Sequence, residues 1–151
     1  MGTINGGGAV YSNNSTVNIE SVDFIGNTSG YYGGALKLDE CVTTLKDVNI
    51  MGASGGTGGA IYASRGELNA ESLTIEGATG SLNGIIYLTG GKATFDKFTV
   101  KDSFAVNGGV LYASTNADVT IKNSEFTGNS ANNGGAIYAG AQSSINVSNT
   151  K

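Results

Sequence analysis

The phrase Gly58-Gly59-Ala60-Ile61-Tyr62 decides the fold, because the chain returns to versions of it six times. Successive copies begin 25 or 26 residues apart. Repetition at a fixed spacing of this length indicates a solenoid, in which every repeat forms one coil. The copies are GGAVY at 7–11, GGALK at 33–37, GGAIY at 58–62, NGIIY at 83–87, GGVLY at 108–112 and GGAIY at 134–138.

Two further segments of each repeat alternate apolar and polar residues with the period of a β-strand. In the first repeat the apolar positions are Val17 and Ile19, followed by Val22 and Phe24. Turns rich in Gly, Asn and Ser separate the segments. The sequence therefore predicts three short strands in each repeat.

A single repeat of this size cannot bury its own apolar residues, whereas stacked coils enclose a shared core. The economical solution is an all-β fold: a right-handed, single-stranded parallel β-helix of the pectin-lyase-like type, with about six coils. A leucine-rich repeat has a similar period but needs a helical return, which these glycine-rich and β-branched segments do not offer. We expect residues 1–151 to form a single β-helix domain that is a segment of a longer solenoid.

The second residue of the phrase is glycine in every repeat, so this position either has no room for a Cβ atom or requires a positive φ. The first residue is glycine except at Asn83, and asparagine tolerates the left-handed region better than other residues. We therefore expect the first position to be left-handed. The second-position glycines are Gly8, Gly34, Gly59, Gly84, Gly109 and Gly135.

The last residue of each phrase is predicted to face outward, because the apolar residue before it faces the core. We expect this row to run beside an outer column of small or apolar residues that begins with Ala9 and Ala35. Stacked aromatic side chains of this kind suit a protein partner or sugar rings; alternatively, their stacking only stabilises the coils. The tyrosine row consists of Tyr11, Lys37, Tyr62, Tyr87, Tyr112 and Tyr138.

Composition argues against several other functions. The net charge is −4 and the cationic residues are scattered singly, so the sequence predicts no nucleic-acid partner. With no histidine and the single cysteine Cys41, which we interpret as a small turn residue, no Cys/His metal site or internal disulfide is expected. No apolar run is long enough for membrane insertion by this segment.

Many β-helices are polysaccharide lyases or hydrolases, which need clustered carboxylates and supporting cationic groups. Here the only arginine is Arg65, and the acidic residues are spread over different columns. The densest acidic spot, Asp39 with Glu40, is predicted to be a solvated turn. We therefore expect no catalytic, cofactor-binding or metal-binding residues, and no cofactor.

The phrase Gly-Gly-Ala followed by Ile, Leu or Val, combined with Phe-x-x-Asn at Phe24 to Asn27 and at Phe126 to Asn129, resembles a known repeat. It is similar to that of chlamydial polymorphic membrane proteins and of adhesin-like β-helix proteins from other microbes, over the whole chain. The resemblance implies an internal asparagine column that includes Asn27 and Asn129. The middle repeats interrupt this column with Ala53, Ala78 and Ser103.

The resemblance further implies an autotransporter-type passenger of the outer membrane, located extracellularly or on the cell surface. The first residues lack the basic and apolar regions of a signal peptide. The expected function is a non-catalytic adhesin segment that binds a protein or glycan on a cell surface. The alternatives are a structural subunit that stacks end to end with further copies, for which the ends without caps are the signal, and a polysaccharide-active enzyme.

Overall fold

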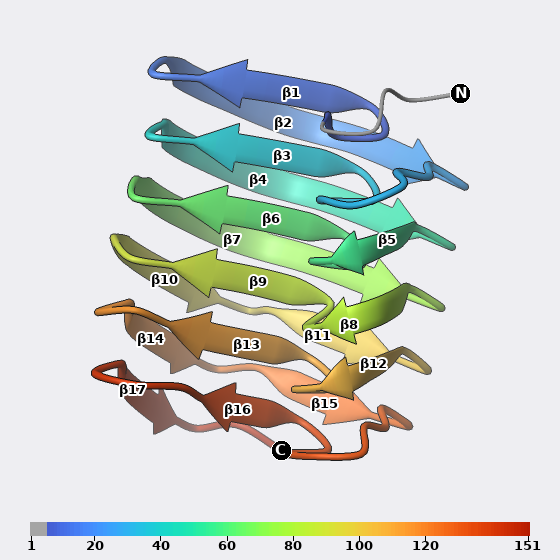
Figure 1. The fold of residues 1–151 in the computed structure, drawn as a ribbon, viewed down its shortest axis with the longest axis vertical. Coiled ribbons are helices and arrows are strands. Elements are labelled where there is room, and N and C mark those ends of the chain that lie inside the picture. The colour runs from blue at the N-terminus through green and yellow to red at the C-terminus, as the bar shows by residue number, and fades with distance from the viewer. Residues whose placement is uncertain (1–5) are drawn as a thin grey trace.

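The computed structural model describes residues 6–151 as a parallel β-solenoid of about six coils, and this part of the chain contains no helix. In Figure 1 the strands in front run to the left, the strands behind run to the right, and each coil lies below the previous one. Viewed down the rod, the chain thus turns clockwise as it moves away, which makes the solenoid right-handed. The predicted fold class is confirmed.

The first sheet contains one strand from each coil, and it carries the residues of the repeated phrase. Its neighbouring strands are parallel and pair without register shifts. Equivalent residues of successive coils therefore lie directly beside each other. In order along the sheet, the strands are β1 (Val10–Asn13), β3 (Leu36–Asp39), β6 (Ile61–Ser64), β9 (Ile86–Thr89), β13 (Leu111–Ser114) and β16 (Ile137–Ala139).

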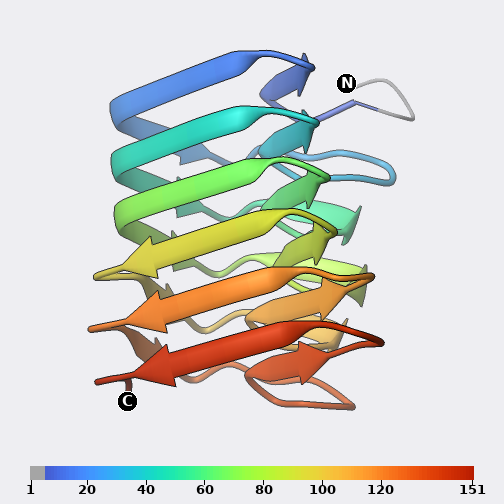
Figure 2. The ribbon, with the colours of Figure 1, turned by 90° about the vertical axis from the view of Figure 1, so that its left-hand side faces the viewer.

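The second sheet contains the two other predicted segments of each repeat, and Figure 2 shows its strands stacked coil upon coil. In the first three coils the two segments form one long strand that bends at a residue with positive φ, such as Ser21 (54°) or Asp47 (51°). In later coils the strand divides there. The strands are β2 (Thr16–Ile25), β4 (Val42–Met51), β7 (Glu67–Glu76), β10 (Lys92–Asp96), β11 (Thr99–Lys101), β14 (Asp118–Lys122), β15 (Glu125–Thr127) and β17 (Ser144–Ser148).

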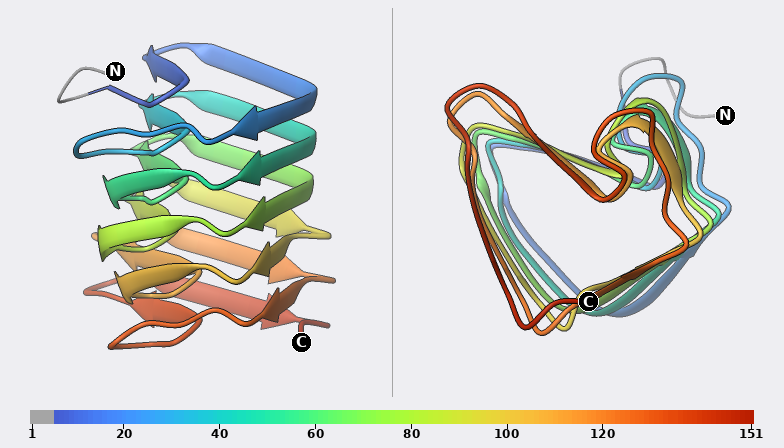
Figure 3. Two further views of the ribbon diagram at one scale, coloured as in Figure 1. Left: turned by 90° about the vertical axis from the view of Figure 1, so that its right-hand side faces the viewer. Right: turned by 90° about the horizontal axis from the view of Figure 1, so that it is seen from below.

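A third, smaller sheet forms where the sequence predicted only turns. It consists of β5 (Ser54–Thr57), β8 (Thr79–Asn83) and β12 (Phe104–Asn107), which lie one above another in Figure 3. Isolated bridges extend this pairing to Thr28 and Ser130 in the neighbouring coils. Seen from below, the outline of the coils is indented where this sheet joins the first (Figure 3, right).

The core runs along the inside of the stack and is filled by the predicted apolar columns. Phe95, Phe98 and Leu45 are fully buried, and the rings of Phe95 and Phe98 stack with centroids 4.8 Å apart. Fully burying one such side chain contributes roughly 1.5–3 kcal/mol. Val147 lies in register with the buried Ile121, but it is exposed because β17 is at the edge of the second sheet.

The column that begins with Ala9 and Ala35 is not an outer column, which corrects the prediction. Ala35, Ala60, Ile85 and Val110 are fully buried. The cause lies in the backbone: the N–H groups of Ala35 and Leu36 both donate to the Ala60 carbonyl oxygen, at 2.9 and 3.0 Å. Two consecutive residues that share one acceptor form a bulge, so strand alternation stops and both side chains face inward.

The glycine corner largely behaves as predicted. A Cβ atom on Gly8, Gly34, Gly59 or Gly109 would overlap backbone atoms of the next coil, whereas Gly135 has open space around it. The first position is left-handed in four repeats, with positive φ at Gly33, Gly58, Gly108 and Gly134.

The fourth repeat contradicts the expectation that Asn83 is left-handed. Asn83 pairs with Thr57 and Asn107, and the positive φ (58°) falls on Gly84. Strand β8 has one extra residue in this segment, which shifts its register against both neighbours. The corner after Asn83 is one residue shorter, so the length of the coil is preserved.

Candidate interaction surface

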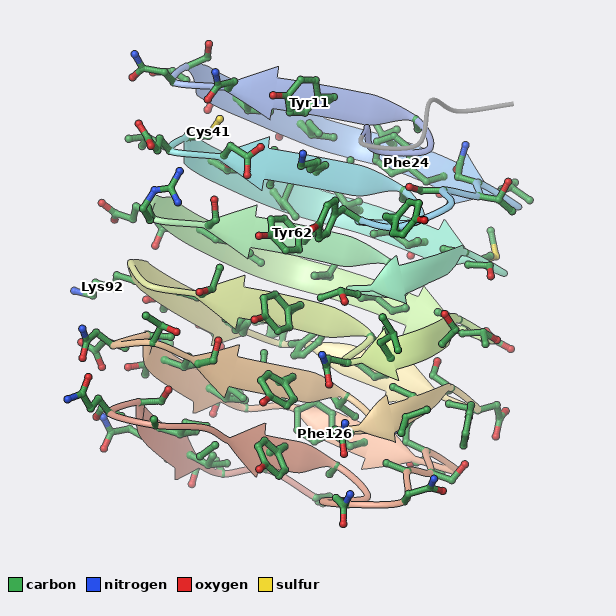
Figure 4. All side chains as sticks on the ribbon, in the orientation of Figure 1. Tyr11, Phe24, Cys41, Tyr62, Lys92 and Phe126 are labelled. Carbon is green, nitrogen blue, oxygen red and sulfur yellow. The ribbon has the colours of Figure 1, made fainter. Side chains whose placement is uncertain are left out.

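The tyrosine row lies on the outer face of the first sheet, as predicted. Tyr62 pairs in register with Lys37 on one side and with Tyr87 on the other. Figure 4 shows Tyr11 and Tyr62 on this outer face, one above the other on strands of the same sheet. Most members are half-buried, because neighbouring rings cover each other, whereas Tyr11 is 54% exposed.

Four members of the row form a continuous face-to-face stack, here called the tyrosine stack: Tyr62, Tyr87, Tyr112 and Tyr138. Their successive ring centroids lie 5.4, 5.3 and 4.7 Å apart, with interplanar angles of 10°, 19° and 12°. Because the ring faces are covered by neighbouring rings, the stack presents ring edges and hydroxyl groups. It is therefore a poor platform for the face-on contact that a sugar ring makes with an aromatic side chain.

Two phenols of the stack, those of Tyr62 and Tyr112, have raised pKa values, which favour the neutral form. Burial raises the pKa of Tyr62 above its ordinary value, and the nearby Asp39 carboxylate raises it further. Burial likewise raises the pKa of Tyr112. A neutral phenol both donates and accepts hydrogen bonds, and the Tyr87 hydroxyl lies 3.1 Å from Ser114 Oγ.

The Tyr32 ring lies beside Lys37 and contacts the next tyrosine of the row, Tyr62. The sequence pattern did not predict this position. Its ring lies 4.7 Å from that of Tyr62 at an angle of 55°. The ammonium of Lys37 lies 4.8 Å from the centre of the Tyr11 ring and 4.9 Å from that of Tyr32. The only signal in the sequence was the pair Tyr31-Tyr32 directly before the third-sheet corner.

Lys37 faces outward but is largely covered, with only 12% of its side chain exposed. Its Nζ lies 3.3 Å from Asp39 Oδ2, and the Ser64 hydroxyl donates to Asp39 Oδ1 at 2.8 Å. Asp39 is thus an internal counter-ion and not a solvated turn residue as predicted. Together with Tyr11, Tyr31 and Tyr32, Lys37 forms what we call the open cluster, since Tyr11 and Tyr31 are each 54% exposed.

The Glu40 carboxylate and the Cys41 thiol of this turn also have hydrogen-bond partners. Arg65 Nε and Nη2 both donate to Glu40 Oε1, at 3.0 and 2.8 Å. Cys41 is buried in the core, and its thiol donates to the Asp39 carbonyl oxygen at 3.2 Å. Cys41 lies between β3 and β4, which agrees with its interpretation as a small turn residue.

A second row of equivalent side chains stands at the end of the third sheet. Asn107 Nδ2 donates to Asn83 Oδ1 at 2.9 Å, and Asn133 Nδ2 donates to Asn107 Oδ1 at 2.8 Å. We call Asn83, Asn107 and Asn133 the asparagine ladder. Their side-chain amides link three successive coils.

The internal asparagine column is partly maintained in the middle coils. Asn129 Oδ1 accepts from the Ser103 backbone N–H at 3.1 Å, and Asn129 Nδ2 donates to the Val100 carbonyl at 2.8 Å. Ser103 repeats this arrangement with a hydroxyl, which accepts from the Ala78 N–H at 3.1 Å and donates to the Lys101 carbonyl at 2.9 Å. The Ser103 hydroxyl therefore takes over the hydrogen-bonding role that an asparagine side chain has at Asn129.

The outer face of the second sheet carries a column of charged residues, and two ion pairs form between neighbours in it. Lys46 pairs with Glu20 at 3.0 Å and Lys122 with Asp96 at 3.2 Å. Glu71, which lies beside the like-charged Asp96, pairs with Lys97 at 3.6 Å. These exposed pairs stabilise the fold little, by about 0–1 kcal/mol each.

Within residues 6–151 no three His, Cys, Asp or Glu side chains come together as metal ligands could. The described residues also contain no helix of the length and apolarity that a membrane span requires.

One family model matches the chain, and the match falls on the fifth and sixth coils. It is the model of the Chlamydia polymorphic membrane protein (Chlamydia_PMP) repeat, and it covers residues 123–140. This segment includes both Phe126 to Asn129 and Gly134 to Tyr138, the two halves of the repeated motif. Comparisons with curated proteins and with solved structures gave no match. Residues 123–140 therefore carry a Chlamydia polymorphic membrane protein repeat within a parallel β-solenoid.

Proposed function

We propose that this chain is a non-catalytic, surface-displayed segment of adhesin type, and that the outer face of its first sheet binds a protein or glycan on a cell surface. The observation that carries the proposal is the row of tyrosine rings from Tyr11 to Tyr138 on one face of a rigid rod, in which the Lys37 ammonium connects the rings of Tyr11 and Tyr32. The match to a membrane-protein repeat supports surface display.

The row has the properties of an energetic hot spot. Tyrosine supplies a large amphipathic contact area and loses little side-chain entropy on binding. Here the side chains are already ordered by their neighbours and stand on paired strands, so little further ordering is needed when a partner binds. The face-to-face tyrosine stack offers edges and hydroxyls, which suit a protein surface better than the face of a sugar ring.

The open cluster is the part of the row where ring faces remain accessible. Tyr11 and Tyr31 are the most exposed tyrosines. Tyr11 lies against the ammonium of Lys37, and the Tyr31 ring lies 6.5 Å from the Tyr32 ring, which contacts the same ammonium. Aromatic side chains around a largely desolvated charge pair are typical of the centre of a binding surface. We therefore place the first contact with the partner at this end of the row.

The test compares adhesion of coated beads to cultured epithelial cells. One variant carries Tyr62→Ser, Tyr87→Ser and Tyr112→Ser; the matched control carries Thr44→Ser, Thr94→Ser and Thr120→Ser on the second sheet. Circular dichroism establishes that both variants are folded. The proposal predicts lost adhesion for the tyrosine variant alone, and equal adhesion of both variants would contradict it.

A structural role by coil-on-coil assembly is the second candidate, and one observation favours it. Asn27 Oδ1 is buried and has no hydrogen-bond partner among residues 6–151, whereas the equivalent Asn129 bonds two backbone groups of the preceding coil. A further coil stacked above β2 would supply a backbone N–H for Asn27. Under this proposal the variant Asn27→Leu, which removes the acceptor and keeps a similar size, weakens self-association in sedimentation velocity, and unchanged association would contradict it.

A further inference from the structure

The tyrosine stack brings oxidisable phenols of successive coils into contact on one face of the rod. In-register pairing of the strands fixes this arrangement, because Tyr87 lies beside Tyr62 on one side and beside Tyr112 on the other. These side chains are half-buried, and Figure 4 shows Tyr62 on the outer face of its strand. The hydroxyl groups and ring edges are therefore accessible to an oxidant, while the rings are held against each other.

Few other side chains of this chain compete for a one-electron oxidant. The sequence contains no tryptophan, and its single cysteine, Cys41, is buried. It contains seven tyrosines, of which four form the tyrosine stack. Because neighbouring phenols in contact are chemically identical, an electron can pass between them with little net change in free energy. Radicals that form in the stack can therefore meet on adjacent rings.

The spacing within the stack suits coupling between neighbouring rings. Successive ring centroids lie 5.4, 5.3 and 4.7 Å apart, and the rings are nearly parallel. The centroids of two directly bonded phenol rings are only slightly closer than this. Bond formation therefore requires the rings to rotate about their side-chain torsions until their edges meet, and it leaves the paired strands in place. Because the partners are already held together, coupling within one chain is favoured over coupling between chains.

We propose that the tyrosine stack is a site of oxidative cross-linking, at which dityrosine bonds join successive coils. A peroxidase with hydrogen peroxide is the oxidant, and it removes one electron and one proton from each of two neighbouring phenols. The two radicals form a bond between ring carbons ortho to their oxygens. Each of these carbons then loses its hydrogen as a proton, and each oxygen regains one. The two electrons and two protons removed at the start reduce hydrogen peroxide to two molecules of water.

The dityrosine bond acts as a covalent staple between coils. With one cysteine, the chain cannot form an internal disulfide that would serve this purpose. Tyr62 and Tyr87 are 25 residues apart, so a bond between them closes a loop that contains one complete coil. Closing such a loop lowers the conformational entropy of the unfolded chain and so stabilises the folded state. Bonds at several positions of the stack would join several coils.

The test treats the folded 151-residue chain with a peroxidase and hydrogen peroxide over a dilution series. Dityrosine is measured by its fluorescence in monomers that are separated under denaturing conditions. Trypsin then places the four tyrosines in different peptides, 47–65, 66–92, 102–122 and 123–151, and mass spectrometry identifies the linked pairs. We expect links between neighbouring peptides of this series, in a yield per chain that is unchanged by dilution. Dityrosine confined to covalent dimers, or a yield that falls on dilution, would overturn the proposal.

Two variants with equal numbers of tyrosines complete the test, and circular dichroism establishes that both are folded. Tyr87→Phe with Tyr138→Phe keeps the stacked rings but leaves no two phenols of the stack in contact. The matched control, Tyr11→Phe with Tyr31→Phe, removes two exposed phenols outside the stack. We expect the linked pairs of stack peptides to disappear from the first variant alone, and their loss from both or from neither would contradict the proposal.

The staple itself is tested by urea denaturation of purified cross-linked monomers of the natural chain. They should unfold at a higher urea concentration than the untreated protein, because their unfolded state is restricted. An unchanged or lower midpoint would refute the stabilising role of the bonds.

Discussion

The Lys37 ammonium lies 3.3 Å from the Asp39 carboxylate and between the rings of Tyr11 and Tyr32, so a charge replaces one ring of an otherwise aromatic row. The side chains of both ions are mostly covered. A pair in this setting is less screened by water than an exposed one. Its contribution to the free energy of unfolding should therefore be large enough to measure.

A double-mutant cycle tests this pair. Lys37→Met keeps the aliphatic stem and removes the charge, and Asp39→Asn keeps the shape of its partner. We expect each single change to lower the free energy of unfolding, with a coupling energy of about 0.5–2 kcal/mol in urea denaturation. Strictly additive effects would show that the two charges do not interact.

The tyrosine stack should stabilise the fold in proportion to the number of ring contacts. Tyr112 contacts two rings of the stack and Tyr138 contacts one. Tyr112→Leu should therefore cost about 0.5–1.5 kcal/mol more than Tyr138→Leu in the free energy of unfolding. A cost that is equal or reversed would mean that burial, and not stacking, sets the energetics.

Alkaline pH should weaken the fold through the buried phenols. Because the pKa values of Tyr62 and Tyr112 are raised in the folded state, their contribution is complete below the unfolded value of about 10. It is lost as the pH rises from there through the folded values, because only the unfolded chain has released its protons. Urea denaturation across this window should give a steeper decline for the natural chain than for Tyr62→Phe with Tyr112→Phe. Parallel declines would contradict the prediction.

The glycine corner offers a matched pair of substitutions. A Cβ atom on Gly109 would overlap the Gly135 carbonyl oxygen, whereas a Cβ atom on Gly135 meets open space. We expect Gly109→Ala to destabilise the chain by several kcal/mol, roughly the upper range for steric strain in a packed site. Gly135→Ala should be neutral or slightly stabilising, because alanine restricts the unfolded chain. Thermal denaturation of both variants distinguishes the sites, and similar melting temperatures would contradict the steric account.

The repeat period, the first two sheets and the outward direction of the tyrosine row could all be predicted, because apolar alternation at a fixed spacing specifies them. The third sheet could not, since segments such as Ser54–Thr57 are too rich in glycine to alternate. Tyr32 was missed for the same reason. The inward column at Ala35 and Ile85 depends on a bulge, which a count of alternating residues does not reveal.

The most direct measurement of the central claim, that the outer face of the first sheet is the binding surface, is protection from chemical labelling on cells. The chain is iodinated and acetylated before and after binding to cultured epithelial cells, and labelled peptides are quantified. We predict that Tyr11 and Tyr31 lose label on binding while the exposed Lys92, the first residue of β10 in the second sheet (Figure 4), stays reactive. Unchanged labelling of Tyr11 and Tyr31 in the bound protein would contradict the claim.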